Sequence, residues 1–346
     1  MSNDNPYTSN TTYKAVARQI AQARSIALCS HQKPDGDALG SLLALRRALA
    51  VLGIDATVTL QGPLAGNLAG VIADDEEVHI IADASEVRDV PADLIIIADT
   101  GARSQLEMLL SWLDRNRDRC VILDHHVHGD FEAAWRIIDP TCAAAAQLIL
   151  RLLDAMHVEV TGGPHSIAEA LLLGIATDTG WFRYNNADAT VFRDVARLLE
   201  AGADKSRLFS LVEENDRPSR LALLSRALAS LEIHESGVAL MTLRPADFTA
   251  AHARPEDSTG IVNEPLSIGS VRAAILLTEV EPGLTKISFR SKPANGTVSI
   301  HAGPIDVNRL AAVFGGGGHV HAAGARIKSD ASGARSRILA AVSDLS

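Results

Sequence analysis

The first two hundred or so residues alternate short apolar runs with longer segments in which apolar positions recur at helical spacing. Short apolar runs predict strands, and the helical periodicity between them predicts helices. Strands are expected at Ser25–Ser30, Asp55–Leu60, Val78–Ala82, Ala92–Ala98, Cys120–Leu123 and Arg136–Ile138. Helices are expected at Lys14–Ala23, Leu39–Leu52, Cys142–Met156, Ser166–Ala176 and Ala189–Ala201, after a disordered stretch over residues 1–12. This alternation predicts the α/β class with a doubly wound, mostly parallel sheet.

The pattern changes beyond a charged, glycine-poor segment that predicts one or two connecting helices. Two strand pairs follow it, and then two helices that flank a glycine-rich loop. The strands are expected at Ser230–His234, Gly237–Leu243, Val271–Glu279 and Leu284–Arg290, and the helices at Val307–Phe314 and Ala331–Leu345. We therefore expect a first domain over 1–205, a helical connector over 206–228, and a smaller α/β domain over 229–346.

The length of the chain agrees with two domains, and its composition indicates the cellular compartment. A chain of 346 residues suggests two domains rather than one. Three cysteines, at positions 29, 120 and 142, cannot form a disulfide framework. The chain has no apolar run long enough for a bilayer, and its polar first residues do not form a secretory signal. These features predict a cytoplasmic protein without a membrane partner.

The charge balance bears on the class of ligand. The formal net charge is −10, and no basic stripe is evident along the chain. Proteins that grip long nucleic acid usually present a basic face, so a platform for long nucleic acid is not expected. A small phosphate-bearing ligand remains compatible with the charge, because bound divalent cations reverse the local field where carboxylates gather.

The turn after the first predicted strand holds three candidate metal ligands, His31, Asp35 and Asp37. Two carboxylates this close cannot both stay ionised and desolvated unless a cation compensates them. Gly36 is expected to provide a tight turn, and Pro34 to hold the preceding lysine extended. The alternative is an ordinary polar loop in which Asp37 caps the following helix.

Two further predicted strands end at candidate ligands, Asp99 and the triplet Asp124-His125-His126, and Asp178 follows an apolar helical segment. Taken singly, each aspartate is more typical of a helix cap or a turn. Taken together, they are hard to explain as caps, because the carboxyl ends of parallel strands meet at one edge of a sheet, where ligands bind.

The ligand types indicate which metal would be held. Carboxylate and imidazole groups without thiolate favour Mn²⁺, with Mg²⁺, Co²⁺ or Zn²⁺ as alternatives. Five carboxylates and two histidines are too many for one ion. Two ions that share a bridging carboxylate, roughly 3.5–4 Å apart as in two-metal hydrolases, fit the set better.

In order and spacing, these motifs resemble the DHH phosphoesterases over roughly residues 25–185. The resemblance implies that one ion is held by His31, Asp35 and Asp99, and the other by Asp37, Asp99, His125 and Asp178. It also implies that Asp124 orients both histidines of the triplet, and that His126 contacts the scissile phosphate and protonates the leaving oxygen.

The second domain contains a run of four glycines, which exposes backbone N–H groups to a ligand. Arg290, Ser291 and Lys292 end a predicted strand and suit a phosphate, although a solvated strand end is the alternative. These stretches, and residues 257–263, resemble the DHH-associated substrate-binding domain. The resemblance implies that substrate contacts Arg290, Ser291, Gly315, Gly316, Gly317, Gly318 and His319.

The two domains together resemble the bacterial nanoRNase and pAp phosphatase group. This resemblance implies hydrolysis of short oligoribonucleotides, including linear dinucleotides such as pApA and pGpG, to 5′-mononucleotides, and of pAp to AMP. Hydrolysis of cyclic dinucleotides is an alternative within the enzymes. A nucleotide-binding regulator without catalysis is an alternative of another class. The sequence leaves open whether the chain forms a homodimer.

Overall fold

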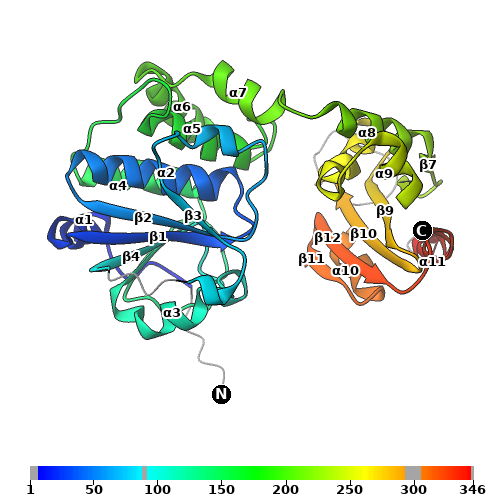
Figure 1. Ribbon diagram of the computed structural model, residues 1–346, viewed down its shortest axis with the longest axis horizontal. Coiled ribbons are helices and arrows are strands. Elements are labelled where there is room, and N and C mark those ends of the chain that lie inside the picture. The colour runs from blue at the N-terminus through cyan, green and yellow to red at the C-terminus, as the bar shows by residue number, and fades with distance from the viewer. Residues whose placement is uncertain (1–6, 88–91, 293–304, 344–346) are drawn as a thin grey trace. The chain divides into compact units, whose positions relative to one another are not determined.

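The computed structural model describes residues 7–87, 92–292 and 305–343. The chain divides into two compact units, Met1–Asn215 and Asp216–Ser346 (Figure 1). The boundary falls between α7 (Lys205–Glu213) and α8 (Pro218–Ala229), so the two helices of the predicted connector belong to different units.

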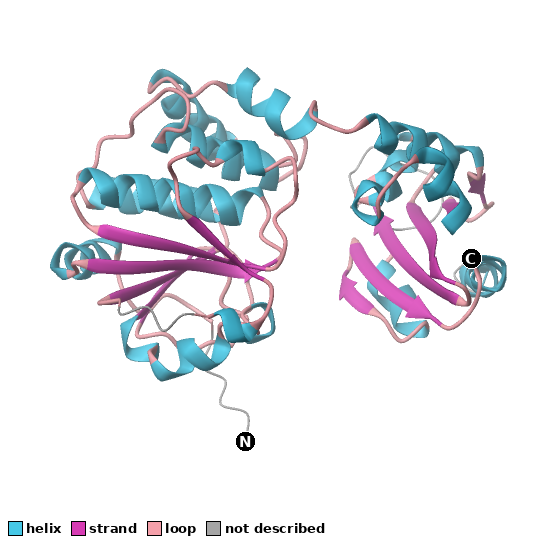
Figure 2. Cartoon of the chain, in the orientation of Figure 1, coloured by secondary structure: helices cyan, strands magenta, loops and turns pink. Residues whose placement is uncertain are grey.

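The first unit is built on a six-stranded sheet in which every neighbouring pair of strands is parallel (Figure 2). Its strands are β1 (Ser25–Gln32), β2 (Asp55–Gln61), β3 (Val78–Ile81), β4 (Leu94–Ala98), β5 (Cys120–Asp124) and β6 (Trp135–Ile138). Each lies where an apolar run predicts a strand. The α/β class with a mostly parallel sheet is therefore confirmed.

Helices cover both faces of this sheet, which is why its central strands are apolar on both sides. All five residues of β4 are buried. On one face a core forms with α1 (Tyr13–Gln22), α2 (Gly36–Val51), α4 (Ala145–Ala155), α5 (Ile167–Asp178) and α6 (Ala189–Glu200). On the other face the short α3 (Leu110–Arg115) contributes Trp112 and Leu113 to a second core (Figure 1).

The strand order β3-β2-β1-β4-β5-β6 reverses direction between β1 and β4. Helices that follow the two sides leave a crevice at such a switch point, outside the carboxyl ends of the strands. β1, β4 and β5 are neighbours there, and His31, Asp99 and Asp124 lie at their carboxyl ends. The topology therefore gathers candidate ligands that are almost a hundred residues apart.

The second unit contains a separate six-stranded sheet, ordered β11-β12-β10-β9-β8-β7. Only β8 and β9 run parallel. The strands are β7 (Glu232–Ile233), β8 (Val238–Leu243), β9 (Ala273–Glu281), β10 (Leu284–Ser291), β11 (Gly317–His319) and β12 (Ala322–Ile327). α10 (Val307–Val313) and α11 (Ala331–Ser343) line a core on one face, and α8 and α9 (Pro245–Ala251) line a core on the other. Both predicted strand pairs are present.

The N-terminal segment differs from expectation where the structure describes it. Residues 7–12 were expected to be disordered, but they lie along the edge strand β6. Asn10 N donates to Arg136 O at 3.0 Å, and Arg136 N donates back to the Asn10 side chain at 2.7 Å. The edge strand has unpaired backbone groups, and this segment satisfies them. Residues 1–6 lie outside the described residues.

Among the described residues, no helix is both long enough and apolar enough to cross a bilayer.

Candidate metal centre

The turn from β1 into α2 places one carboxylate as a helix cap and the next inside the helix. Asp35 is the N-cap, and its Oδ1 accepts the N–H groups of Asp37 and Ala38 at 3.0 and 3.1 Å. The cap is thus Asp35, two residues before the position considered for it. Asp37 instead lies in the first turn of α2, where its side chain is 1% exposed.

Two predictions about this turn are wrong: the conformation of Lys33 and the role of Gly36. Lys33 has φ of 55°, the left-handed region, and is not extended before Pro34. Gly36 has no positive φ. A side chain at Gly36 would instead collide with Thr177, because the start of α2 packs closely on the end of α5. The glycine is needed for this close approach and not for the turn.

Asp37 is held by the N-terminus of α4. Its Oδ2 accepts Ala145 N–H at 2.5 Å and its Oδ1 accepts Ala146 N–H at 3.0 Å. These are two of the N–H groups that lack partners at a helix start, and α4 has no side-chain cap of its own. The positive end of the helix dipole therefore favours a buried carboxylate here.

Asp99 lies between two histidines. It directly follows β4, has φ of 62°, and its Oδ2 is 3.3 Å from His31 Nε2 while its Oδ1 is 3.2 Å from His125 Nε2. His31 Nε2 is also 3.7 Å from Asp35 Oδ1. The carboxylate of Asp99 thus joins a first group, made with His31 and Asp35, to a second group around His125.

That second group contains Asp37 and Asp178, the last residue of α5. His125 Nε2 is 3.6 Å from Asp178 Oδ2 and 4.0 Å from Asp37 Oδ2. The three side chains come from the ends of β5, α2 and α5. Their meeting depends on the close packing of α2 on α5 described above.

Backbone carbonyls determine which ring nitrogen of each histidine faces the carboxylates. Nδ1 of His31 is 2.9 Å from Gln32 O, and Nδ1 of His125 is 3.3 Å from Cys142 O. A carbonyl only accepts, so each Nδ1 carries the proton and a neutral ring presents the lone pair of Nε2 to the carboxylates. This orientation is typical of metal-binding histidines.

The carboxylates and imidazoles shift one another's proton affinity strongly. Burial and the charges of Asp99 and Asp178 hold the pKa of Asp37 well above its usual value. Burial raises the pKa of Asp178 to about 7, with Asp99 and Asp35 adding to the shift against the opposing charge of His125. Burial lowers the pKa of both histidines, but the neighbouring carboxylates outweigh it, so the pKa of His31 rises to about 11 and that of His125 to about 10. The protein without a cation must therefore hold extra protons here.

The residues fit a divalent metal. Three sets of potential ligand atoms each lie within 4.8 Å of one another. They are His31, Asp35 and Asp99; Asp37, His125 and Asp178; and Asp99, His125 and His126. Oδ1 of Asp99 is buried, and when Nε2 of His125 carries no proton this oxygen accepts no hydrogen bond from any described residue. A carboxylate oxygen in that state is costly, and a cation between Asp99 and the two Nε2 lone pairs would satisfy it. The predicted ligands are thus brought together in groups that can hold metal ions.

Asp124 contacts one histidine of the triplet rather than both. Its Oδ1 accepts the backbone N–H of His126 at 3.1 Å and its Nδ1–H at 2.7 Å, and its Oδ2 accepts the hydroxyl of Tyr7 at 2.6 Å. His125 is oriented by the Cys142 carbonyl instead. Burial raises the pKa of Asp124, but the hydrogen bonds from His126 and Tyr7 outweigh it and keep Asp124 ionised. The same carboxylate raises the pKa of His126.

The residues predicted to bind substrate lie together at one end of the second sheet. Arg290 and Ser291 end β10, opposite Ala322 and Ala273, and the glycine run continues into the short strand β11. Gly317, Gly318 and His319 are exposed in a hairpin with β12. Ser291 Oγ is 2.9 Å from Nδ1 of His321, a residue that the sequence reasoning missed.

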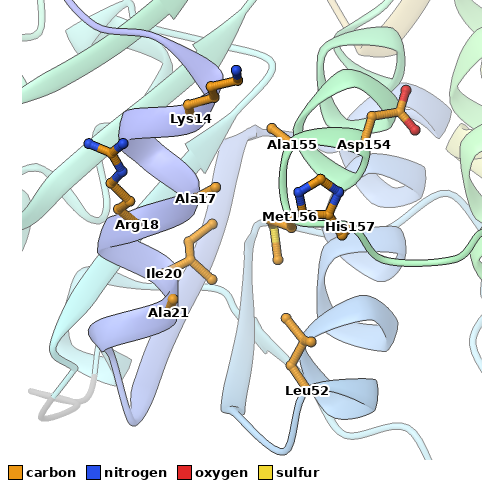
Figure 3. A pocket seen from close by; sticks show the side chains of 10 residues that line it. All are labelled: Lys14, Ala17, Arg18, Ile20, Ala21, Leu52, Asp154, Ala155, Met156 and His157. Carbon is orange, nitrogen blue, oxygen red and sulfur yellow. The ribbon is translucent and has the colours of Figure 1, made fainter.

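A cavity of about 430 Å³ lies elsewhere in the first unit. Figure 3 shows that it is lined by α1 and by the C-terminal ends of α2 and α4, with Leu52 and Met156 facing it. α2 starts at the candidate metal centre and is 16 residues long, which is about 24 Å. The cavity is therefore a separate feature from the metal centre.

Comparison with known proteins agrees with this geometry. Residues 25–175 match the family described as DHH family, N-terminal domain. The Thermus thermophilus protein named bifunctional oligoribonuclease and PAP phosphatase NrnA is 31% identical over 318 residues, which cover 92% of this chain and 89% of its own. The chain belongs to the DHH family of phosphoesterases. Its likeness to NrnA proteins along almost the whole chain, including the 23% identical one of Bacillus subtilis, places it with the NrnA type.

Solved structures share the fold. An exopolyphosphatase-related protein of Bacteroides fragilis aligns over 96% of this chain and 95% of its own, with a TM-score of 0.84 and 25% identity. The Thermus thermophilus RecJ, solved in complex with Mn²⁺, aligns over 95% of this chain and 54% of its own, with a TM-score of 0.51 and 16% identity. The second comparison bears on the fold alone.

Proposed function

We propose that this chain hydrolyses short oligoribonucleotides to 5′-mononucleotides, and pAp to AMP, with two divalent cations, most simply Mn²⁺. The observation that carries the proposal is the place of Asp99, whose two carboxylate oxygens face His31 of the first group and His125 of the second. The activities in the printed names of the NrnA relatives support the substrate class.

In this proposal His31, Asp35 and Asp99 hold one cation. Asp37, His125 and Asp178 would hold the other together with Asp99, whose Oδ1 is 3.2 Å from His125 Nε2. Bound there, the cations would supply an activated water and charge stabilisation at phosphorus. Asp37 keeps its position through the N-terminus of α4, and the two histidines keep theirs through backbone carbonyls. The chain itself thus supplies a preorganised set of ligands.

His126 acts on the leaving group. Its Nδ1 is engaged by Asp124, and its side chain is 53% exposed, so Nε2 is the nitrogen left to meet substrate. Attack of water on phosphorus breaks the bond to the 3′ oxygen, and His126 gives a proton to that oxygen. The 3′ oxygen leaves as a hydroxyl, and the phosphate stays on the 5′ oxygen of the other nucleotide.

The second unit would supply further substrate contacts. Arg290 offers a charged donor to phosphate, and Gly317, Gly318 and His319 are exposed in the neighbouring hairpin. The N–H groups of Gly315 and Gly316 instead donate to Ala312 O and Ala311 O at 3.0 Å, and the buried hydroxyl of Ser291 contacts His321. With a net charge of −10, the chain suits short RNA and nucleotides more than long nucleic acid.

The test compares initial rates of the Mn²⁺-loaded protein on 5′-labelled RNA of 2 to 24 nucleotides, pApA, pGpG, pAp and cyclic di-AMP. The cyclic substrate is included because a Listeria monocytogenes cyclic-di-AMP phosphodiesterase, PdeA, is 25% identical over 330 residues, although this chain covers only 46% of it. We expect the highest rates on RNA shorter than about five nucleotides and on pAp. Preference for cyclic di-AMP or for 24-nucleotide RNA would refute the substrate class.

The variant Asp99→Asn keeps the shape of the side chain but removes the charge shared by both groups. We expect it to lose at least about 1000-fold in kcat, because the neutral amide has one ligating oxygen and can no longer serve both cations. The matched control is Asp83→Asn, since Asp83 lies in an exposed loop of the same unit and caps only a short helical turn. Equal activity of Asp99→Asn and the wild type would refute the shared ligand.

A further inference from the structure

Tyr7 reaches the candidate site from the N-terminal segment. Its hydroxyl donates to Oδ2 of Asp124 at 2.6 Å. Asp124 is fully buried, and its other oxygen already receives two N–H groups of His126. Both oxygens of the carboxylate are therefore engaged, one by the histidine and one by the tyrosine. A carboxylate held at both oxygens cannot rotate about its Cβ–Cγ bond without losing a hydrogen bond.

The backbone holds Tyr7 in place through the pairing of its segment with β6. Ser9 Oγ accepts Ile138 N–H at 2.8 Å and donates to Ile138 O at 3.0 Å, and Asn10 pairs with Arg136. β6 is the edge strand next to β5, whose last residue is Asp124. The pairing therefore fixes Tyr7 at the carboxyl end of the sheet, where the candidate ligands gather.

Two glycines make room for the tyrosine ring. A Cβ on Gly129 would be 2.5 Å from the ring of Tyr7, and a Cβ on Gly101 would collide with its hydroxyl end. Gly101 is two residues after Asp99, and Gly129 is three residues after His126. The tyrosine thus packs between the two loops that carry the bridging carboxylate and the leaving-group histidine.

We propose that Tyr7 is a positioning residue, which fixes the carboxylate of Asp124 so that the ring of His126 presents Nε2 to the leaving oxygen. The inference rests on the proposed role of His126. Tyr7 touches neither substrate nor cation in this account. Without its hydroxyl, Oδ2 of Asp124 lacks a partner in a buried site, and the carboxylate rotates to find one. His126 then loses its fixed orientation.

The test is Tyr7→Phe, which removes one oxygen and keeps the ring between the glycines. We expect kcat on pAp and on dinucleotides to fall about 10–100-fold, the range typical when a partner that orients a functional histidine is lost. KM and the bound Mn²⁺ should stay as in the wild type, because no cation ligand changes. The melting temperature should fall only by the amount that the loss of one buried hydrogen bond costs.

Tyr13→Phe is a matched control. Its hydroxyl is also buried and near the N-terminus, yet it has no hydrogen-bond partner among the described residues. We expect wild-type kcat from Tyr13→Phe. Gly129→Ala displaces the ring of Tyr7 by another route, and adding it to Tyr7→Phe should lower kcat little further, because both changes remove the same contact.

A second readout does not depend on turnover. In ¹⁵N-histidine NMR the wild type should show a single His126 state whose Nδ1 proton is hydrogen-bonded to Asp124, and Tyr7→Phe should show a broadened or doubled His126 Nδ1 signal. Wild-type kcat or an unchanged His126 signal in Tyr7→Phe would overturn the inference, as would a fall in kcat that is explained by loss of bound Mn²⁺ or by unfolding at the assay temperature. If the wild type hydrolyses none of the substrates, the proposed function is refuted. The NMR signal of His126 then still tests whether Tyr7 fixes its ring.

Discussion

Gly174 connects the packing of the first unit to its candidate metal centre. It lies in α5 where α2 and α4 come close, and a Cβ there would be 2.5 Å from Oδ1 of Asp37 and 2.7 Å from the Cβ of Ala146. Both neighbours are constrained, because Ala146 is part of α4 and Asp37 accepts two N–H groups of that helix. We predict that Gly174→Ala displaces Asp37 and weakens cation binding.

The size of the effect follows from two opposing terms. Overpacking a closed site costs about 1–3 kcal/mol, and two contacts this short put the cost near the upper end. Replacing glycine by alanine within a helix returns about 1 kcal/mol. The net loss in free energy of unfolding is about 1–2 kcal/mol. For a unit of this length, that lowers the melting temperature by roughly 2–8 °C.

The assay is differential scanning fluorimetry with increasing Mn²⁺, followed by isothermal titration of the metal-free protein. We expect the lower melting temperature without metal, and at least about tenfold weaker binding of one cation, since a displaced ligand weakens its site. Gly66→Ala is the control, because a Cβ at Gly66 meets no atom within 4 Å. A Gly174→Ala protein with the wild-type melting temperature and Mn²⁺ affinity would refute the reasoning about Asp37.

Two further predictions concern protons. In the metal-free protein the raised pKa values of Asp178, about 7, and His31, about 11, mean that the folded state binds more protons than the unfolded chain, so the melting temperature should fall as pH rises from 6 to 9. Saturating Mn²⁺ should remove this slope, and a melting temperature that rises with pH in EDTA would contradict the prediction. His126→Gln should lower kcat about 10²–10⁴-fold with unchanged Mn²⁺ stoichiometry, measured by steady-state kinetics and metal analysis, because it removes the proton donor and no cation ligand. Loss of bound metal in this variant would instead make His126 a ligand.

The sequence predicts the sheet and its functional edge well for a physical reason. Strands buried on both faces, such as Leu94–Ala98, must be continuously apolar, and the residue that follows them stands out when it is an aspartate. The apolar runs alone therefore suffice to assign Asp99 and Asp124 to the same sheet edge. The two strand pairs of the second unit are equally visible, because a short turn separates each pair.

The remaining features depend on contacts that the local sequence does not encode. Tyr7 and Asp124 are 117 positions apart, and a polar N-terminal segment carries no periodicity that marks it as paired with an edge strand. Asp35 caps α2, and Asp37 does not, because the carboxylate of Asp37 accepts hydrogen bonds from the N-terminus of another helix, α4. Likewise, Gly36 is required by the approach of Thr177, which the residues of the turn alone cannot anticipate.

The central claim is that Asp99 joins two cation sites. The most direct measurement is anomalous X-ray diffraction at the manganese edge from crystals grown with MnCl₂. The account predicts two anomalous peaks in each chain, one near His31 and Asp35 and one near Asp37, His125 and Asp178, with a carboxylate oxygen of Asp99 in contact with both. A single peak, or two ions of which only one touches Asp99, would contradict it.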